Sequence, residues 1–162
     1  MEPTFGFLVS DVTRLLRKVF DQRARRIGLS LAQARALIYL AHHEGINQCG
    51  LADLLEIQPI TLARLLDRMG AAGWIERRAD PDDRRVHRLY LSDKARPLSD
   101  QVLQLAAESR SEALAGFSDG EKDMVMGLLT RVHGNLFKRA PVTCAAAEPP
   151  NDNQDATDDD IR

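Results

Sequence analysis

Residues 57–91, IQPITLARLLDRMGAAGWIERRADPDDRRVHRLYL, decide the fold because the period of their apolar side chains changes partway along the stretch. The first half has apolar side chains at helical spacing: Leu62, Leu65, Leu66 and Met69. Pro59 suits the first turn of such a helix, where its missing amide matters little. The second half alternates apolar and polar side chains on either side of a turn-forming Asp-Pro-Asp-Asp cluster. The stretch therefore predicts a helix over 59–72 and a hairpin with strands at 74–78 and 86–91.

Outward from this stretch, helical periodicity and capping signals predict the rest of the fold. Capping boxes at Ser30–Gln33 and Ser118–Glu121 mark the starts of two more helices. The further predicted helices span about residues 5–27, 31–44, 49–55, 93–116 and 119–139. We therefore expect a mainly α fold with a small β-hairpin.

The composition bounds the class of protein. The chain has 162 residues, 44% of them hydrophobic and 5% aromatic, which suits one compact, mostly helical domain with a tail. No run approaches the roughly 18 apolar residues of a membrane span, and no secretory signal pattern opens the chain. Cys49 and Cys144 are too few and too far apart to suggest a disulfide framework or a zinc site. These features favour a reduced, cytoplasmic protein.

Charge is distributed unevenly along the chain. The net charge is −2, but six acidic residues and one arginine give residues 141–162 a charge of −5, which leaves +3 on residues 1–140. The Ala, Pro, Asn and Asp composition of residues 141–162 cannot bury a core, so we expect a disordered acidic tail. The mildly basic remainder permits nucleic-acid binding without demonstrating it.

The helix predicted over residues 59–72 has two unlike sides, as a helix that enters a DNA major groove must have. Its rear is apolar, and the candidate DNA contacts lie at its N-terminal end or off the apolar stripe: Gln58, Pro59, Thr61, Arg64 and Arg68. Thr and Arg side chains bond base edges or phosphates. An ordinary surface helix with solvated arginines shows the same pattern, so this helix alone does not decide between the two.

The predicted hairpin adds a second basic feature. Its candidate DNA contacts are Arg77, Arg84, Arg85, His87 and Arg88. Short arginine-bearing extensions reach phosphates and narrow minor grooves, where the negative potential is strongest. Asp83 would fix the direction of the arginines by bonding Arg77 or turn amides, and a solvated charge cluster is the alternative. The helix and the hairpin together favour DNA binding.

Over about residues 5–139 the sequence resembles the MarR family of bacterial regulators, and within it is most similar to the SlyA-type branch. The resemblance rests on Leu51–Ala52, Ile57–Met69, Gly73–Arg77, Asp83–Arg85 and Leu91–Ala95. The Gly-aromatic-Ile-x-Arg run, followed by Asp-Arg-Arg and a Leu-Ser/Thr step, is specific to the family. Glu56 departs from the Gly that is common before the recognition helix, and Ser92 replaces the more usual Thr.

The resemblance implies a winged helix-turn-helix flanked by N- and C-terminal dimerisation helices. Residues 29–91 would bind DNA, and residues 1–28 and 92–140 would form the homodimer. Such a protein would be a transcriptional repressor or anti-repressor that binds pseudo-palindromic operators on double-stranded DNA. Helix 59–72 would enter the major groove, and wing 74–91 the minor groove.

The family resemblance also assigns individual contacts. Thr61 and Arg64 would contact the major groove, Arg85 at the wing tip would enter the minor groove, and Asp83 would orient the wing. It further implies a crevice for small aromatic or phenolic effectors, with candidate lining residues Arg17, Arg35, Tyr39, His42 and Arg64. The alternative is that these five are helix-surface groups, as such residues more often are.

A homodimer can also be argued from the terminal helices themselves. Their apolar stripes leave more hydrophobic surface than three central helices cover. The side chains exposed on a monomer would be Phe5, Phe7, Leu8, Phe117, Val132, Leu136 and Phe137. A single intramolecular bundle is the alternative way to cover them.

No catalytic, cofactor or metal-binding constellation stands out. His42 and His43 are adjacent and cannot face one point on a helix, and His87 and His133 are isolated. There is no phosphate-binding glycine loop and no nucleophile elbow, so we expect neither an enzyme nor a cofactor. Cys49, near a helix start, is either an inert residue or a redox sensor. Two other functions stay open: a winged-helix module for protein–protein contact, and a small-molecule-binding protein that needs no DNA.

Overall fold

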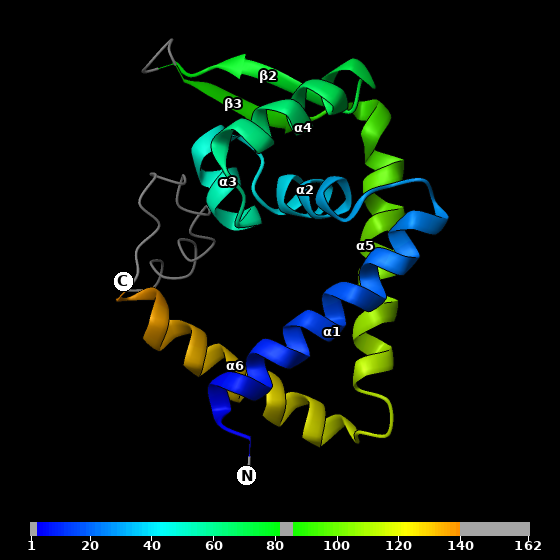
Figure 1. The fold of residues 1–162 in the computed structure, drawn as a ribbon, viewed down its shortest axis with the longest axis vertical. Coiled ribbons are helices and arrows are strands. Elements are labelled where there is room, and N and C mark those ends of the chain that lie inside the picture. The colour runs from blue at the N-terminus through cyan, green and yellow to red at the C-terminus, as the bar shows by residue number, and fades with distance from the viewer. Residues whose placement is uncertain (1–2, 82–85, 140–162) are drawn as a thin grey trace, which may run out of the picture.

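The computed structural model describes residues 3–81 and 86–139 (Figure 1). The helices are α1 (Phe5–Arg26), α2 (Leu31–His42), α3 (Gln48–Leu55), α4 (Pro59–Ala71), α5 (Arg96–Ala113) and α6 (Asp119–Phe137). The strands are β1 (Ile46–Asn47), β2 (Ile75–Ala79) and β3 (His87–Leu91), and a 3-10 turn, η1 (Asp93–Ala95), precedes α5. The mainly α fold with a small β-sheet is confirmed.

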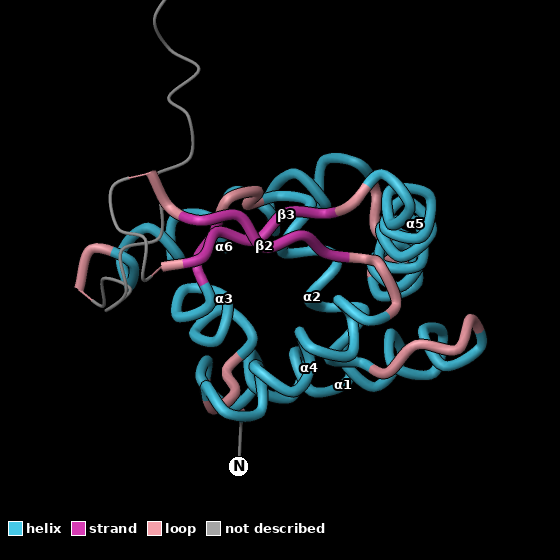
Figure 2. Tube along the Cα trace, turned by 90° about the horizontal axis from the view of Figure 1, so that it is seen from above, coloured by secondary structure: helices cyan, strands magenta, loops and turns pink. Residues whose placement is uncertain are grey.

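The sheet has three strands where the sequence predicted a two-stranded hairpin. Strands β2 and β3 pair antiparallel, with Ile75 opposite Leu91, and run side by side in Figure 2. The added strand, β1, pairs with the other edge of β3 and places Ile46 opposite Leu89. A two-residue strand is too short to show an alternating pattern, which is why sequence reasoning missed it.

Both predicted capping boxes are present. At the start of α2, Ser30 accepts a hydrogen bond from the Gln33 amide, and the Gln33 side chain accepts one from the Ser30 amide. At the start of α6, Ser118 and Glu121 make the same reciprocal pair. Each box satisfies amides that the first helical turn leaves without partners, and so sets where the helix begins.

One hydrophobic core joins most of the elements. Its largest fully buried side chains come from α2, α3, α4, β3 and α5: Leu37, Leu40, Leu51, Leu55, Leu62, Leu65, Leu66, Met69, Leu89 and Val102. Helix α1 adds only Phe20 and Ala24, near its C-terminal end. The core therefore lies at the end of the molecule that carries α4 and the hairpin, with α5 running away from it (Figure 1).

The other end of the molecule is not covered. No residue of α6 is buried. Large apolar side chains are exposed on α1, on α6 and between α5 and α6: Phe5, Phe7, Leu8, Val9, Val12, Leu15, Phe117, Met124, Met126, Leu128, Leu129, Leu136 and Phe137. Of the side chains expected here, only Val132 is half-buried. The alternative of a single intramolecular bundle is therefore wrong for the described residues.

Candidate nucleic-acid interface

Helix α4 presents a polar face to solvent. Leu62, Leu65, Leu66 and Met69 are buried along its rear, as their spacing predicted. At about 100° per residue, Arg64 falls opposite this stripe and Thr61 and Arg68 fall to one side of it, and all three are exposed. Gln58 and Pro59 are exposed at its N-terminal end. All five candidates on this segment are therefore open to solvent.

The N-terminal end of α4 differs electrostatically from that of α6. Gln58, at the N-cap, makes no side-chain hydrogen bond to the first turn, and that turn contains no acidic residue. In α6, Asp119 and Glu121 occupy the first turn. There the Ser118 hydroxyl and amide donate hydrogen bonds to Glu121, which lowers the pKa of its carboxyl. The positive end of the α4 dipole is therefore left open to an anion such as phosphate.

Two arginines stabilise the turn that leads into α4. Glu56, the C-cap of α3, has φ 58°, a left-handed conformation that glycine adopts more readily. Arg17 of α1 donates to both Glu56 carboxylate oxygens, at 3.0 and 2.9 Å. Arg35 of α2 donates to the carbonyls of Leu54 and Leu55 at the end of α3. The departure from the expected glycine is thus compensated by an ion pair with α1.

The arginines of the described part of the wing are engaged with neighbouring carboxylates. Arg77 of β2 pairs with Asp67 of α4 at 2.7 Å, which connects the hairpin to α4. Asp67 was not foreseen as the partner of Arg77, and Asp83 lies outside the described residues. Arg78 pairs with Glu76 and lies 4.2 Å from the centroid of the Tyr90 ring. The hydrogen bond to Glu76 raises the pKa of Arg78.

Arg88 of β3 lies opposite Arg78, next to the last pair of the β2–β3 ladder before the turn. Its guanidinium bonds Asp80 at 2.7 Å and the carbonyl of Gly45 at 3.3 Å, so it joins β3 to the segment before β1. Asp80 is buried, and such a charge is stable only when it is paired. His87 is exposed. The candidates Asp83, Arg84 and Arg85 lie outside the described residues.

Comparison with known proteins shows where this architecture recurs. The model of the MarR family matches residues 29–87. The crystal structure of the transcriptional regulator PA3341 is 34% identical, covers 84% of this chain and 100% of its own, and superposes with a TM-score of 0.74. This chain belongs to the MarR family.

Two other solved structures support the same fold. A MarR transcriptional regulator from Methanosarcina mazei Go1 is 26% identical over 83% of this chain and 97% of its own, with a TM-score of 0.74. The transcriptional regulator SlyA, at 23% identity over 81% and 92% with a TM-score of 0.67, shows likeness of fold alone. MarR-family members are transcriptional regulators, not enzymes, that bind DNA and function as dimers. The family thus implies DNA binding by the winged helix-turn-helix described here.

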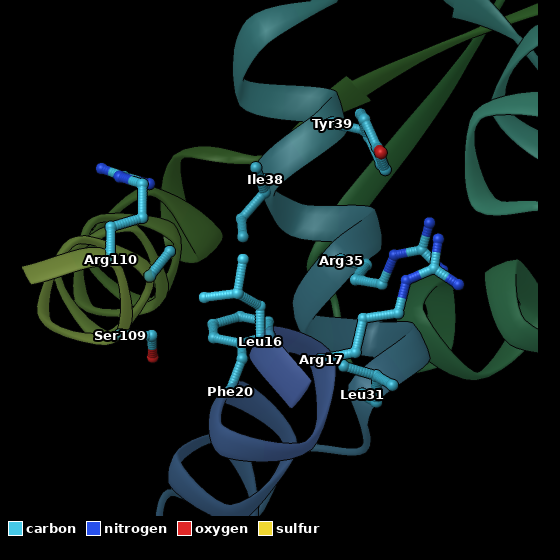
Figure 3. A pocket seen from close by; sticks show the side chains of 10 residues that line it. Leu16, Arg17, Phe20, Leu31, Arg35, Ile38, Tyr39, Ser109 and Arg110 are labelled. Carbon is cyan, nitrogen blue, oxygen red and sulfur yellow. The ribbon is translucent and has the colours of Figure 1, made fainter. Parts of the chain in front are cut away.

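The MarR-family chain also has a cavity of about 260 Å³ between α1, α2 and α5. Its lining residues are Leu16, Arg17, Phe20, Leu31, Arg35, Ile38, Tyr39, Ala106, Ser109 and Arg110. In Figure 3 the guanidinium groups of Arg17 and Arg35 lie on one side, and the apolar side chains of Leu16, Phe20 and Ile38 on the other. Of the five expected lining residues, Arg17, Arg35 and Tyr39 are present, whereas His42 and Arg64 are not among those that line it.

Other candidate chemistry is limited in this MarR-family chain. Over residues 3–81 and 86–139, no group of three or more His, Cys, Asp or Glu side chains could hold a metal ion. No helix in the same ranges is long and apolar enough to cross a membrane. Cys49, in the first turn of α3, is disulfide-bonded, so the expectation of isolated, reduced cysteines is wrong for this residue. Cys144 lies outside the described residues.

Proposed function

We propose that the protein is a cytoplasmic, dimeric transcription regulator, a repressor or anti-repressor, that binds pseudo-palindromic operators. Residues 29–91 bind DNA, with α4 in the major groove and wing 74–91 in the minor groove, and residues 1–28 and 92–140 form the dimer. One observation carries the proposal: α4 has a buried rear, an exposed polar face and an N-terminal end without a side-chain cap or an acid.

The exposed face of α4 offers the chemistry that base recognition requires. Thr61 and Arg64 are three residues apart, so they are neighbours on the helix surface. An arginine bonds guanine O6 and N7 together, and a threonine bonds a base edge or phosphate. Arg68 lies one turn further along, where a phosphate contact would set the register. At the wing tip, Arg85 would enter the minor groove.

The exposed apolar stripes of α1 and α6 support the dimer. A two-fold dimer presents two copies of α4 to one side of the duplex, about one helical turn apart, which matches a pseudo-palindromic site. A wing used for protein contact is the competing function. It predicts a partner complex that persists when the DNA-facing arginines are removed, and no operator binding.

The test is fluorescence anisotropy with duplexes selected by the purified protein from random and upstream DNA. Arg64→Ala should weaken operator binding by about ten- to hundredfold and relax base preference at one position per half-site. Arg131→Ala removes the same charge from α6, at the other end of the molecule, and should leave affinity nearly unchanged. Equal losses from both variants, or none from Arg64→Ala, would contradict the proposed interface.

We also propose that a small phenolic or aromatic anion in the α1–α2–α5 cavity controls DNA binding. The cavity combines apolar walls with three arginines, and one of them, Arg17, already pairs with Glu56 beside the start of α4. A ligand carboxylate would compete with Glu56 for Arg17 and so reach the turn that positions the recognition helix. Because Arg17 and Glu56 are 38% and 63% exposed, their pair contributes only about 0–1 kcal/mol, which a ligand readily offsets.

Binding of a hydroxybenzoate panel, measured by calorimetry, tests this control. Glu56→Gln should tighten binding up to about fivefold by freeing Arg17, and Arg17→Gln should weaken it by tenfold or more. Arg110→Gln is the control, because its guanidinium points away from the other lining side chains in Figure 3. If no hydroxybenzoate binds, or if Arg17→Gln and Arg110→Gln behave alike, the effector proposal fails.

We place the chain nearest the SlyA-type branch of the family, on the Gly-Trp-Ile-Glu-Arg and Asp-Arg-Arg motifs. A phylogeny of MarR-family sequences tests this placement, and clustering with a different branch would refute it.

A further inference from the structure

Ile60 differs in location from the other large apolar residues that are exposed. It is 64% exposed at the second position of α4. In the parts of the chain that the structure describes, the other large apolar side chains that are exposed lie in α1, in α6 or at Phe117. Those belong to the uncovered end of the molecule. Ile60 instead lies at the opposite end, on the surface that α4 presents.

The fold gives no packing reason for an isoleucine at this position. Ile57 and Leu62, which flank the helix start as a hydrophobic staple would, both pack against the core. Ile60 is absent from the core and from the apolar residues packed against it. A β-branched residue is also a mediocre helix former, and a first turn favours acidic side chains. Neither packing nor helix stability accounts for Ile60.

The position of Ile60 matches the base-reading face. It precedes Arg64 by one helical turn, and by helical spacing both fall on the side opposite the buried stripe, with Thr61 at the edge of the same exposed face. In the major groove, the one apolar group on a base edge is the C5 methyl of thymine. A lone isoleucine is also far smaller than a protein interface, which buries about 800 Å² per partner.

We propose that Ile60 is a specificity-determining residue that contacts a thymine methyl group, so that each operator half-site requires thymine at one position. The proposal rests on the proposed function, since it needs α4 in the major groove. Burying one methyl group is equivalent to about a fourfold change in affinity, so two symmetric half-sites give about fifteenfold.

The experiment replaces each thymine of the selected operator in turn with deoxyuridine, which removes only the C5 methyl. Wild-type protein should lose about fourfold in affinity at one position per half-site, and about fifteenfold when both are replaced. Ile60→Ala should bind both duplexes equally at that position and keep its other methyl sensitivities. Ile60→Val, which retains a branched side chain, should show an intermediate loss. The fluorescence of Trp74 and the thermal midpoint, unchanged in Ile60→Ala, confirm that the variant folds.

The outcomes distinguish failure of the thymine contact by Ile60 from failure of the proposed DNA binding. Operator binding without sensitivity to any thymine methyl, or sensitivity that persists unchanged in Ile60→Ala, overturns the inference and leaves the proposed function intact. Failure of the wild type to prefer any duplex would overturn the proposed function, and this inference with it. Loss of all binding by Ile60→Ala while Ile60→Val binds normally but is insensitive to deoxyuridine would also overturn it.

Discussion

Helices α4 and α6 are both amphipathic, yet they differ in how much of each is buried. Four of the 13 residues of α4 are buried, whereas none of the 19 residues of α6 is. Their N-terminal ends also differ: α6 is closed by a capping box and two acids, and α4 has neither. The same helical period therefore serves two purposes. In α4 the apolar face completes the core and the end stays open to a ligand, and in α6 the apolar face is available to a second copy of the chain.

The largest expected effect comes from the core behind α4. Leu66→Ala leaves a cavity at a fully buried site and should lower the free energy of unfolding by about 2–5 kcal/mol. Urea unfolding at fixed protein concentration, followed by the fluorescence of the single tryptophan, Trp74, measures this loss. A cost below that of Leu129→Ala in α6 would contradict the contrast between the two helices.

Substitutions on the exposed face of α6 should affect stability less than Leu66→Ala does. They should, however, disrupt the dimer. Leu129→Glu with Leu136→Glu puts two charges on its apolar stripe and should raise the dimer dissociation constant roughly hundredfold or more. The control is Asp123→Lys, which by helical spacing lies on the polar side of α6. Sedimentation velocity measures the mass of each variant. A double variant that stays dimeric would mean that α6 does not form the interface.

The smallest expected effect is a difference in pH dependence between the capping box of α6 and that of α2. Glu121 has a lowered pKa in the folded protein, so its contribution to helix stability is present above the ordinary glutamate pKa and is lost as pH falls through the lowered value. Gln33 in the α2 box has no such dependence. Hydrogen exchange of the first-turn amides should therefore quicken at acid pH, relative to the intrinsic rate, in α6 and not in α2. Glu121→Gln should abolish the difference, and equal behaviour of both helices would refute it.

Local signals accounted for much of the fold. Helix α4 was predicted over 59–72 and spans Pro59–Ala71, because Pro and Gly mark its two ends. The strands of the wing begin one residue later than predicted, at Ile75 and His87. Strand β1 was missed because its pairing with β3 is a long-range contact that two residues cannot signal.

The candidate site was only partly accessible from sequence. Solvent exposure of Thr61 and Arg64 follows from helical period, but the partners of Arg77 and Arg88 are set through space by Asp67 and Asp80. Similarly, the family resemblance places Arg17 in a crevice, but it does not predict the hydrogen bonds from Arg17 to Glu56. Ile60 is apolar, so a search for polar side chains that bond DNA does not select it. Its position off the buried stripe was the available signal.

In the proposed complex, two copies of this chain bind one duplex through the open face of α4. The most direct measurement is the affinity of the full-length protein for its selected operator and for a scrambled duplex of equal length, as salt is raised from about 50 to 200 mM. We expect two chains per operator, at least about a thousandfold preference over the scrambled duplex, and a steep fall in affinity with salt. Equal affinity for both duplexes, or operator binding that does not change with salt, would contradict it.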